Sequence, residues 1–258
     1  MKKRVLAIGL ALALLLVFGS IGASAASPED EGRALLEQTL AIFNSGTYTL
    51  KGRGHSPVGV GAGSSAPIVI AVDQDKVMTE TEIDWSGLMQ ASSPGGDAYM
   101  TAVQRTIWQL VFGRKFRMVF SPEGVFWVFP ERMLYIDMAA LAGGVGEPIG
   151  LAQEFTGIFA RREIPEQLTV TQPVIDGKTY LCVTLDIPEN AGTISYFYLN
   201  GQFKRVEIFS ESEADPVVYE IDQFNGKADE CYFSTRWMRP VPVSLLLQLG
   251  SGLSSLIQ

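Results

Sequence analysis

The stretch KFRMVFSPEGVFWVFPERMLYIDM, residues 115–138, has the pattern of two antiparallel strands joined by a turn at Pro122-Glu123. Side chains alternate between the two faces of a strand, so pairing the residues outward from this turn assigns each of them to a face. One face is strongly apolar and carries Phe116, Met118, Phe120, Val125, Trp127 and Phe129. The opposite face is mixed and carries Arg117, Val119, Phe126 and Val128. The stretch therefore predicts a hairpin that packs its apolar face against another layer.

Further hairpins are predicted on both sides of this stretch. A strand at residues 47–54 precedes a hairpin at 67–85, and residues 167–187 contain a turn at Asp176-Gly177. The segment TISYFYLNGQFKRVEIFSE, residues 193–211, reads as two strands joined at Asn200-Gly201. Its apolar residues do not all fall on one side, so both of its faces need cover.

Helices are predicted at three places. Residues 27–46 begin with Ser27 as a cap and Pro28 at the first helical position, followed by acidic residues that favour the positive helix start. A second helix is predicted at 97–113, and one or two more at 137–162. The order of helices and hairpins, without regular strand–helix alternation, predicts an α+β fold with a large curved antiparallel sheet.

The first 26 residues have the pattern of a signal peptide. A basic segment at 1–4 precedes an almost wholly apolar run at 5–22, and small residues at Ala23-Ser24-Ala25 stand at the usual cleavage spacing. We expect cleavage after residue 25 or 26 and an extracytoplasmic protein, either secreted or periplasmic. An uncleaved anchor is the alternative, because the apolar run is long enough to span a bilayer.

The remaining chain is acidic and long enough for one domain or two small ones. Three of the 20 basic residues lie in the first four positions, so the exported chain would carry 28 acidic and 17 basic residues. This charge argues against nucleic acid and against an anionic membrane surface as partners. We expect contact with a membrane only through the signal segment. We expect one domain at residues 27–243 and a C-terminal tail at 244–258.

The two cysteines, Cys182 and Cys231, each lie in a strand-like run, TYLCVTL and DECYFST. An even pair in an oxidising compartment predicts one disulfide between them. Two buried thiols on separate strands are the alternative.

Few residues offer catalytic chemistry. The single histidine, His55, lies in a loop rich in glycine and serine, and one histidine with two separated cysteines cannot form a standard zinc site. We therefore expect no enzyme activity, no metal and no cofactor. A glycosidase that uses two of the many carboxylates is the alternative.

Several segments resemble one known family. They are EGRALLEQTLAIFNSGTYTLKGRG at 31–54, VFWVFPERMLYIDM at 125–138, and the segments of the last predicted strands, ISYFYLNGQFKRVEIF, YEIDQFNGK and CYFSTRWMRPVPV. Together they resemble the lipoprotein-carrier superfamily, which includes LolA-like periplasmic carriers and LppX-like lipid-binding lipoproteins. The resemblance implies a strongly curved, incomplete β-barrel with an N-terminal helix and inserted lid helices. The sequence departs from the LppX-like branch because it has no lipobox.

The family resemblance and the apolar face together predict a binding protein. We expect a lipid, a lipoprotein acyl chain or another apolar ligand in a curved-sheet cavity, with helices at 97–112 and 137–161 as a movable cover. The predicted lining is Phe116, Met118, Phe120, Val125, Trp127 and Phe129. The alternative is an envelope interaction or sensory domain of the same fold, with a filled core and a protein partner.

Overall fold

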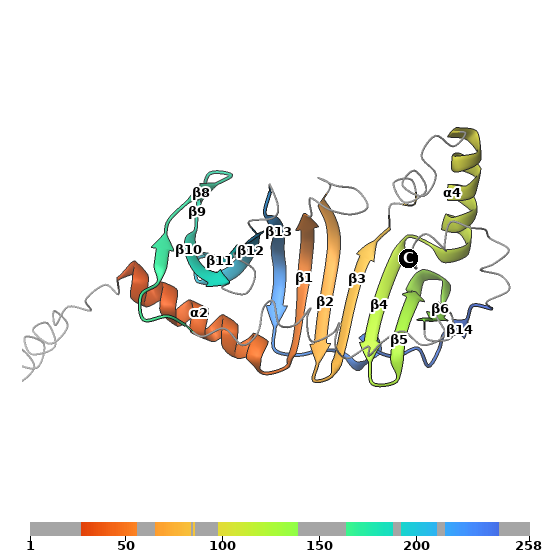
Figure 1. The fold of residues 1–258 in the computed structure, drawn as a ribbon, viewed down its shortest axis with the longest axis horizontal. Helices are drawn as coiled ribbons and strands as arrows, with labels where there is room; N and C mark the ends of the chain where they lie inside the picture. The colour runs from red at the N-terminus through yellow and green to blue at the C-terminus, as the bar shows by residue number, and fades with distance from the viewer. Residues whose placement is uncertain are drawn as a thin grey trace, which may run out of the picture.

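A computed structural model of the chain describes residues 27–55, 65–83, 85, 98–138, 164–187, 192–210 and 215–242. One long sheet runs through the molecule, with helix α2 (Pro28–Asn44) at one end and helix α4 (Ala98–Phe112) at the other (Figure 1). The predicted signal peptide, the predicted helices beyond residue 138 and the predicted tail lie outside the described residues. No helix among the residues described is long and apolar enough to cross a membrane.

The main sheet has 12 strands, in the order β14-β6-β5-β4-β3-β2-β1-β13-β12-β11-β10-β7. The first six strands in sequence are β1 (Thr47–His55), β2 (Ser65–Asp73), β3 (Lys76–Glu82), β4 (Lys115–Ser121), β5 (Gly124–Phe129) and β6 (Leu134–Asp137). The others are β7 (Thr169–Thr171), β10 (Leu181–Ile187), β11 (Gly192–Leu199), β12 (Gln202–Ser210), β13 (Val217–Asn225) and β14 (Arg239–Pro240). A separate hairpin joins β8 (Val174–Ile175) to β9 (Lys178–Thr179).

The strands form two blocks that meet in the middle of the sheet. Strands β1 to β6 are neighbours in chain order, and so are β10 to β13. The first strand, β1, then pairs antiparallel with the last long strand, β13, in a register that places Thr49 opposite Asn225. Every pair in the main sheet is antiparallel except β14 with β6. The predicted α+β class is therefore confirmed.

Helix α2 begins as the sequence predicts. The Ser27 hydroxyl accepts the backbone N–H of Asp30 at 3.1 Å, and the Asp30 carboxylate accepts the N–H of Ser27, which makes a capping box. Its buried face, which includes Leu36, Leu40 and Phe43, packs against the sheet. The helix therefore covers one face of strands from both blocks.

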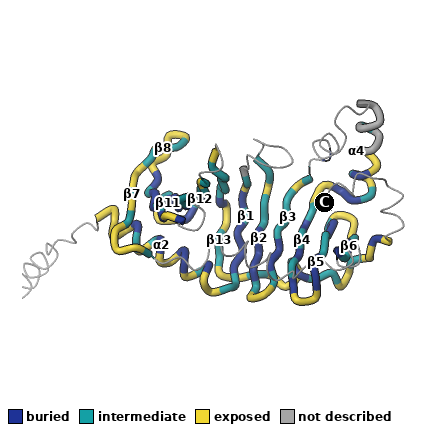
Figure 2. Tube along the Cα trace, viewed as in Figure 1, coloured by how far each residue is buried: buried dark blue, intermediate teal, exposed yellow. Residues whose placement is uncertain are grey.

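The sheet has an inner face, on which α2 and α4 lie, and an outer face. Figure 2 shows the buried residues running along the strands between the two helices. Buried clusters on the inner face join α2 to β1, β2 and β10 to β13, and join α4 to β5 and β6. The outer face is crossed by residues 226–240, named the strap, which run from β13 to β14 (Figure 1). Strap residues Phe233, Tyr232 and Met238 pack on Met78 and on the outward side chains of β4 and β5.

The strap corrects one prediction. The segment from Cys231 onward was expected to be a strand, but Glu230–Tyr232 form a 3-10 helix, η3, and only Arg239–Pro240 join the sheet. The outward side chains Ala71, Met78, Val119 and Val128 form an apolar cluster on β2 to β5 that needs cover. The strap, an irregular segment that lies across these strands, provides this cover. Because it is irregular, its sequence shows neither the strand nor the helix periodicity.

Candidate functional site

The hairpin of β4 and β5 places the six predicted lining residues on one face. Met118 lies opposite Trp127 and Phe120 opposite Val125, as outward pairing from Pro122-Glu123 predicts. The rings of Phe116 and Phe129 are 5.8 Å apart. All six point to the inner face. Val125 and Phe129 are buried, whereas the other four are half-buried.

A row of side chains crosses the inner face at the level of Met118. Cross-strand pairing joins six strands in the order Leu50, Ile70, Thr79, Met118, Trp127 and Ile136. Leu50, Ile70 and Ile136 are only 1–2% exposed, whereas the three residues between them are half-buried. The row is therefore fully covered at both ends and only partly covered in the middle.

The two covered ends belong to different helices. At one end Leu36, Leu40 and Phe43 of α2 close over β1 and β2. At the other end Trp108 and Phe112 of α4 pack on Phe129 and Ile136.

Trp85 completes the cover at the α4 end. Its ring lies 5.4 Å from that of Trp108, and its indole N–H donates to the Gly113 carbonyl at 2.7 Å. The partly covered middle, named the inner gap, consists of Thr79, Thr81, Phe116, Met118, Phe120 and Trp127.

The inner gap has the chemistry of an apolar binding surface. None of its six side chains carries a charge, and its polar groups are the two threonine hydroxyls and the indole N–H of Trp127. The rings of Phe116 and Trp127 meet edge to face at 5.6 Å, a favourable arrangement that keeps both rings in place. Such a surface favours hydrocarbon over polar or ionic ligands.

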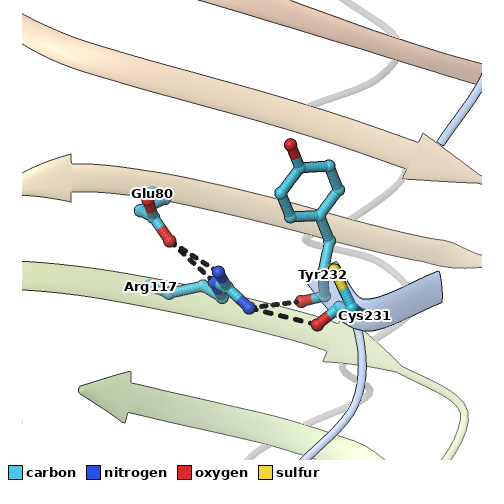
Figure 3. Close-up of polar contacts among 4 residues, drawn as sticks. All are labelled: Glu80, Arg117, Cys231 and Tyr232. Atoms are coloured by element: carbon cyan, nitrogen blue, oxygen red, sulfur yellow. Dashed lines mark hydrogen bonds and ion pairs between the residues drawn. The ribbon is translucent and has the colours of Figure 1, made fainter. Parts of the chain in front are cut away.

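Arg117 holds the reverse side of the same strand. It lies between Phe116 and Met118 but points to the outer face, where Nε and Nη2 donate to Glu80 Oε2 at 2.9 and 2.7 Å (Figure 3). Its Nη1 donates to the carbonyl oxygens of Cys231 and Tyr232, at 3.3 and 3.2 Å. This arginine therefore ties β3, β4 and the strap together directly behind the inner gap.

Arg117 was predicted only as part of a mixed face. Its sequence signal is an arginine inside an apolar strand with a glutamate, Glu80, at the facing position of the preceding strand. The strap carbonyls gave no signal, because any residue type supplies a backbone oxygen.

The hairpin of β11 and β12 has cover on both faces, which answers the question its sequence raises. Ile194, Tyr196 and Tyr198 face α2. On the opposite face Phe197 packs with Tyr180 and Cys182, next to the β8–β9 hairpin. The chain's own side chains cover both faces of β11, whereas Phe209 of β12 is 41% exposed.

Thr39 and Tyr198 pair their hydroxyl groups beneath α2. The Tyr198 hydroxyl donates to Thr39 Oγ1 at 3.0 Å, and the Thr39 hydroxyl donates to the Leu35 carbonyl at 2.9 Å. Burial raises the pKa of Tyr198 well above its ordinary value, although the hydrogen bond to Thr39 acts in the opposite direction. Burial raises the pKa of Tyr48 in the same way. These phenols are thus held neutral as parts of the core.

The predicted disulfide is wrong. Cys182 is a buried free thiol on β10, and Cys231 is an exposed free thiol in η3. Cys231 lies over β4, since its carbonyl accepts from Arg117, and six strands separate β10 from β4 in the sheet. A disulfide needs Cα atoms within about 7 Å, which this arrangement does not allow.

Catalytic groups do not converge on the inner gap within the described part of the chain. No three His, Cys, Asp or Glu side chains described here lie close enough together to hold a metal ion. His55 is the last residue of β1, next to residues outside the description.

The chain is similar to several solved structures. No protein-family model matches the chain, and no curated protein matches it. An uncharacterized conserved protein from Thermus thermophilus is 7% identical with a TM-score of 0.37, over 81% of this chain and 97% of that chain. LprF from Mycobacterium bovis is 9% identical with a TM-score of 0.40, over 77% of this chain and 95% of that chain. A chain of the Pseudomonas aeruginosa MucA/MucB complex is 11% identical with a TM-score of 0.35, over 79% of this chain and 60% of that chain.

Identities of 7–11% and TM-scores of 0.35–0.40 are low. Ligand and partner are therefore inferred from the residues of this chain.

Proposed function

We propose that this protein is an exported, non-enzymatic binding protein that holds a lipid, a lipoprotein acyl chain or another apolar ligand against its inner face. The observation that carries the proposal is the inner gap, an uncharged, half-buried surface between two fully buried clusters. The ligand-binding residues are Phe116, Met118, Phe120, Val125, Trp127 and Phe129. The proposed domain spans residues 27–243, and the signal peptide directs it out of the cytoplasm.

Burial of hydrocarbon supplies the affinity. Each methylene group removed from water contributes about 0.8 kcal/mol, so a chain of about ten methylenes contributes roughly 8 kcal/mol before the cost of ordering it. Met118 and Trp127 stand at the centre of the gap and become fully covered when such a chain lies across them. The ligand gains contact with an already ordered face.

The finer features of the proposal concern the cover. We propose a sheet curved into an incomplete barrel, with the helix at 97–112 and the helices that the sequence predicts at 137–161 closing over the bound chain. The described end of α4 supports this, because Trp108 and Phe112 already cover the neighbouring part of the inner face. A movement of α4 would widen the gap without breaking the strand pairing.

A protein ligand is the second candidate function. The gap residues are half-buried rather than open, and Phe116 and Trp127 already contact each other. A filled core of this kind would suit an envelope interaction domain, whose partner binds elsewhere on the surface.

The decisive experiment measures uptake of a fluorescent fatty acid by the delipidated protein. Met118→Glu places a charge in the middle of the gap and is expected to abolish uptake. Val174→Glu is the matched control, because it places the same charge at an exposed apolar position on β8. Native mass spectrometry followed by organic extraction tests whether a lipid co-purifies. No uptake by the unaltered protein, or equal uptake by both variants, would refute the proposal.

A further inference from the structure

The α4 end of the molecule combines exposed apolar side chains with basic ones. Six large apolar side chains are exposed among the residues described, and four of them lie on α4 and next to β6 and β14. These four are Ile107, Leu110, Met133 and Trp237, with exposed fractions of 42%, 66%, 46% and 77%. Exposed arginines stand among them, at Arg114, Arg132, Arg236 and Arg239. These eight residues are named the end surface.

Direct contacts join the elements of the end surface. The Arg132 guanidinium donates to the Gln109 carbonyl of α4 at 3.4 Å, and the Arg239 N–H donates to the Met133 carbonyl at 2.8 Å. Val241, just after β14, packs in one cluster with Trp108 of α4. Figure 1 shows α4, β6 and β14 at the same end of the sheet. The exposed residues therefore belong to one end of one packed unit.

The charge at this end is opposite to that of the whole chain. The chain carries 28 acidic and 20 basic residues, yet residues 98–112 and 232–240 contain no acidic residue. The acidic residues between them on η1 (Pro130–Arg132) and β6 are the exposed Glu131, whose carboxylate accepts the Arg114 backbone N–H at 2.7 Å, and the half-buried Asp137, so the four arginines outnumber them. Charges interact over about 10 Å at moderate ionic strength. An anionic surface that approaches this end is therefore attracted by the local arginines, and the net negative charge of the whole chain has little effect.

We propose that the end surface docks on a lipid bilayer that contains anionic headgroups. Trp237 packs against the Arg236 guanidinium at 5.3 Å, which pairs an interfacial aromatic ring with a cation that reaches phosphate. Tryptophan favours the headgroup level, aliphatic side chains enter just below it, and arginine binds anionic lipid. A second copy of the chain fits less well, because a two-fold interface would bring like-charged arginines together.

This inference differs from the expectation that the acidic chain avoids anionic membranes, because that expectation used the net charge alone. It stands independently of the proposed ligand. Membrane docking at this end would nevertheless bring the inner gap close to a lipid source, since Phe116 and Trp127 pack in the same cluster as Trp108.

The test is vesicle binding by residues 27–258, which keep every residue of the four core clusters. Vesicles of phosphatidylcholine with phosphatidylglycerol are compared with phosphatidylcholine alone, by flotation and tryptophan emission. We expect preference for the anionic vesicles, weakening with salt, and a blue shift of emission that Trp237→Phe removes. Arg236→Gln with Arg239→Gln should lower the affinity roughly thirtyfold, since each of the two basic residues near an anionic surface contributes on the order of 1 kcal/mol.

Two matched controls isolate the end surface. Lys178→Gln with Lys227→Gln makes the same change in net charge at exposed positions outside the end surface and should leave vesicle affinity unchanged. Leu110→Gln should weaken binding, whereas Val174→Gln, at a position 67% exposed on β8, should not. The arginine, lysine and Val174 variants, all of which lie outside α4 and the inner gap, should keep fatty-acid uptake, which separates this proposal from the proposed function.

Three results would each overturn the inference. The first is that the unaltered protein does not bind the anionic vesicles. The same conclusion holds if the protein binds no vesicles and the end-surface variants instead weaken its binding to an envelope protein. The second is equal binding to both kinds of vesicle. The third is an equal loss of affinity in the control variants. Near-ultraviolet circular dichroism of each variant confirms that a loss of binding is not a loss of folding.

Discussion

Arg117 and Glu80 form a buried ion pair with side-chain exposures of 11% and 15%, in which two guanidinium nitrogens share one carboxylate oxygen. The third nitrogen of Arg117 holds the strap. Arg117→Leu would leave the Glu80 carboxylate buried without its partner and two strap carbonyls without a donor. We expect a loss of about 3–5 kcal/mol in the free energy of unfolding, measured by denaturant titration.

The control for this pair is the double variant Arg117→Leu with Glu80→Leu. Removing both charges eliminates the unpaired buried carboxylate, so most of the lost stability should return. Amide hydrogen exchange in residues 229–233 should remain faster in both variants, because the strap has lost its donor. A single variant whose stability is close to that of the unaltered protein would contradict the role assigned to Arg117.

Strand β1 has two glycines at neighbouring inward positions, and we expect only one of them to be required. A Cβ atom at Gly52 would lie 1.8 Å from the Glu220 carbonyl oxygen, at the bulge where β1 and β13 change register. At Gly54 the nearest atoms are those of the Tyr219 ring at 3.4 Å, which is ordinary contact. Gly52→Ala should therefore destabilise the protein by about 2 kcal/mol or more, whereas Gly54→Ala should be close to neutral in thermal unfolding. A Gly52→Ala variant that is as stable as the unaltered protein would show that the bulge does not need its glycine.

Replacing tyrosine with phenylalanine should have different effects on stability at two buried positions. Tyr198→Phe removes the donor to Thr39 and should cost about 1 kcal/mol. The Tyr48 hydroxyl is also buried but has no hydrogen-bond partner among the described residues, so Tyr48→Phe should be neutral or stabilising. Chemical denaturation of the two variants side by side gives the comparison. A larger loss for Tyr48→Phe would indicate a partner for that hydroxyl.

Stability should fall in alkaline solution because of the same tyrosines. Burial raises the pKa of Tyr48 and Tyr198 in the folded state above the ordinary value of about 10. The unfolded chain then loses these protons first, so their contribution is complete below about pH 10 and is lost as the pH rises further. Tyr48→Phe should make the decline shallower. If stability falls with pH equally steeply in Tyr48→Phe and in the unaltered protein between about pH 9 and 12, this linkage is wrong.

The gap and the core should respond differently to truncation. Phe112→Ala removes a side chain that is 0% exposed and should cost about 3–5 kcal/mol. Trp127→Ala removes a half-buried side chain and should cost less, while fatty-acid uptake falls more than it does in Phe112→Ala. The measurements are urea unfolding and probe titration on both variants. Equal uptake by the two variants would place the ligand away from Trp127.

Local patterns predicted the elements of this fold well. The turns at Pro122-Glu123, Asp176-Gly177 and Asn200-Gly201 each join paired strands, and Ser27 caps the first helix. The six apolar side chains of β4 and β5 share a face because alternation along a hairpin depends only on neighbouring residues. Such features are set by residues close together in the sequence.

Long-range features were not predictable in the same way. The pairing of β1 with β13, the path of the strap and the separation of Cys182 from Cys231 depend on how distant segments pack. The hydrophobic pattern of β11 and β12 showed that both faces need cover, but it did not reveal that the cover near Phe197 comes from Tyr180 and Cys182. The end surface was not predicted, because the net charge of the chain does not show where individual charged side chains lie.

The meeting of β1 with β13 sets an order on folding. The hairpins β2–β3, β4–β5 and β11–β12 can each close as soon as their own residues are available, whereas the central seam must wait until residue 225 arrives. Closing a loop that holds most of the chain is slow, so an emerging polypeptide would hold two half-sheets with open edges for a time. The vulnerable moment for aggregation or proteolysis is that delay, and a chaperone that shields the edge of β1 would relieve it.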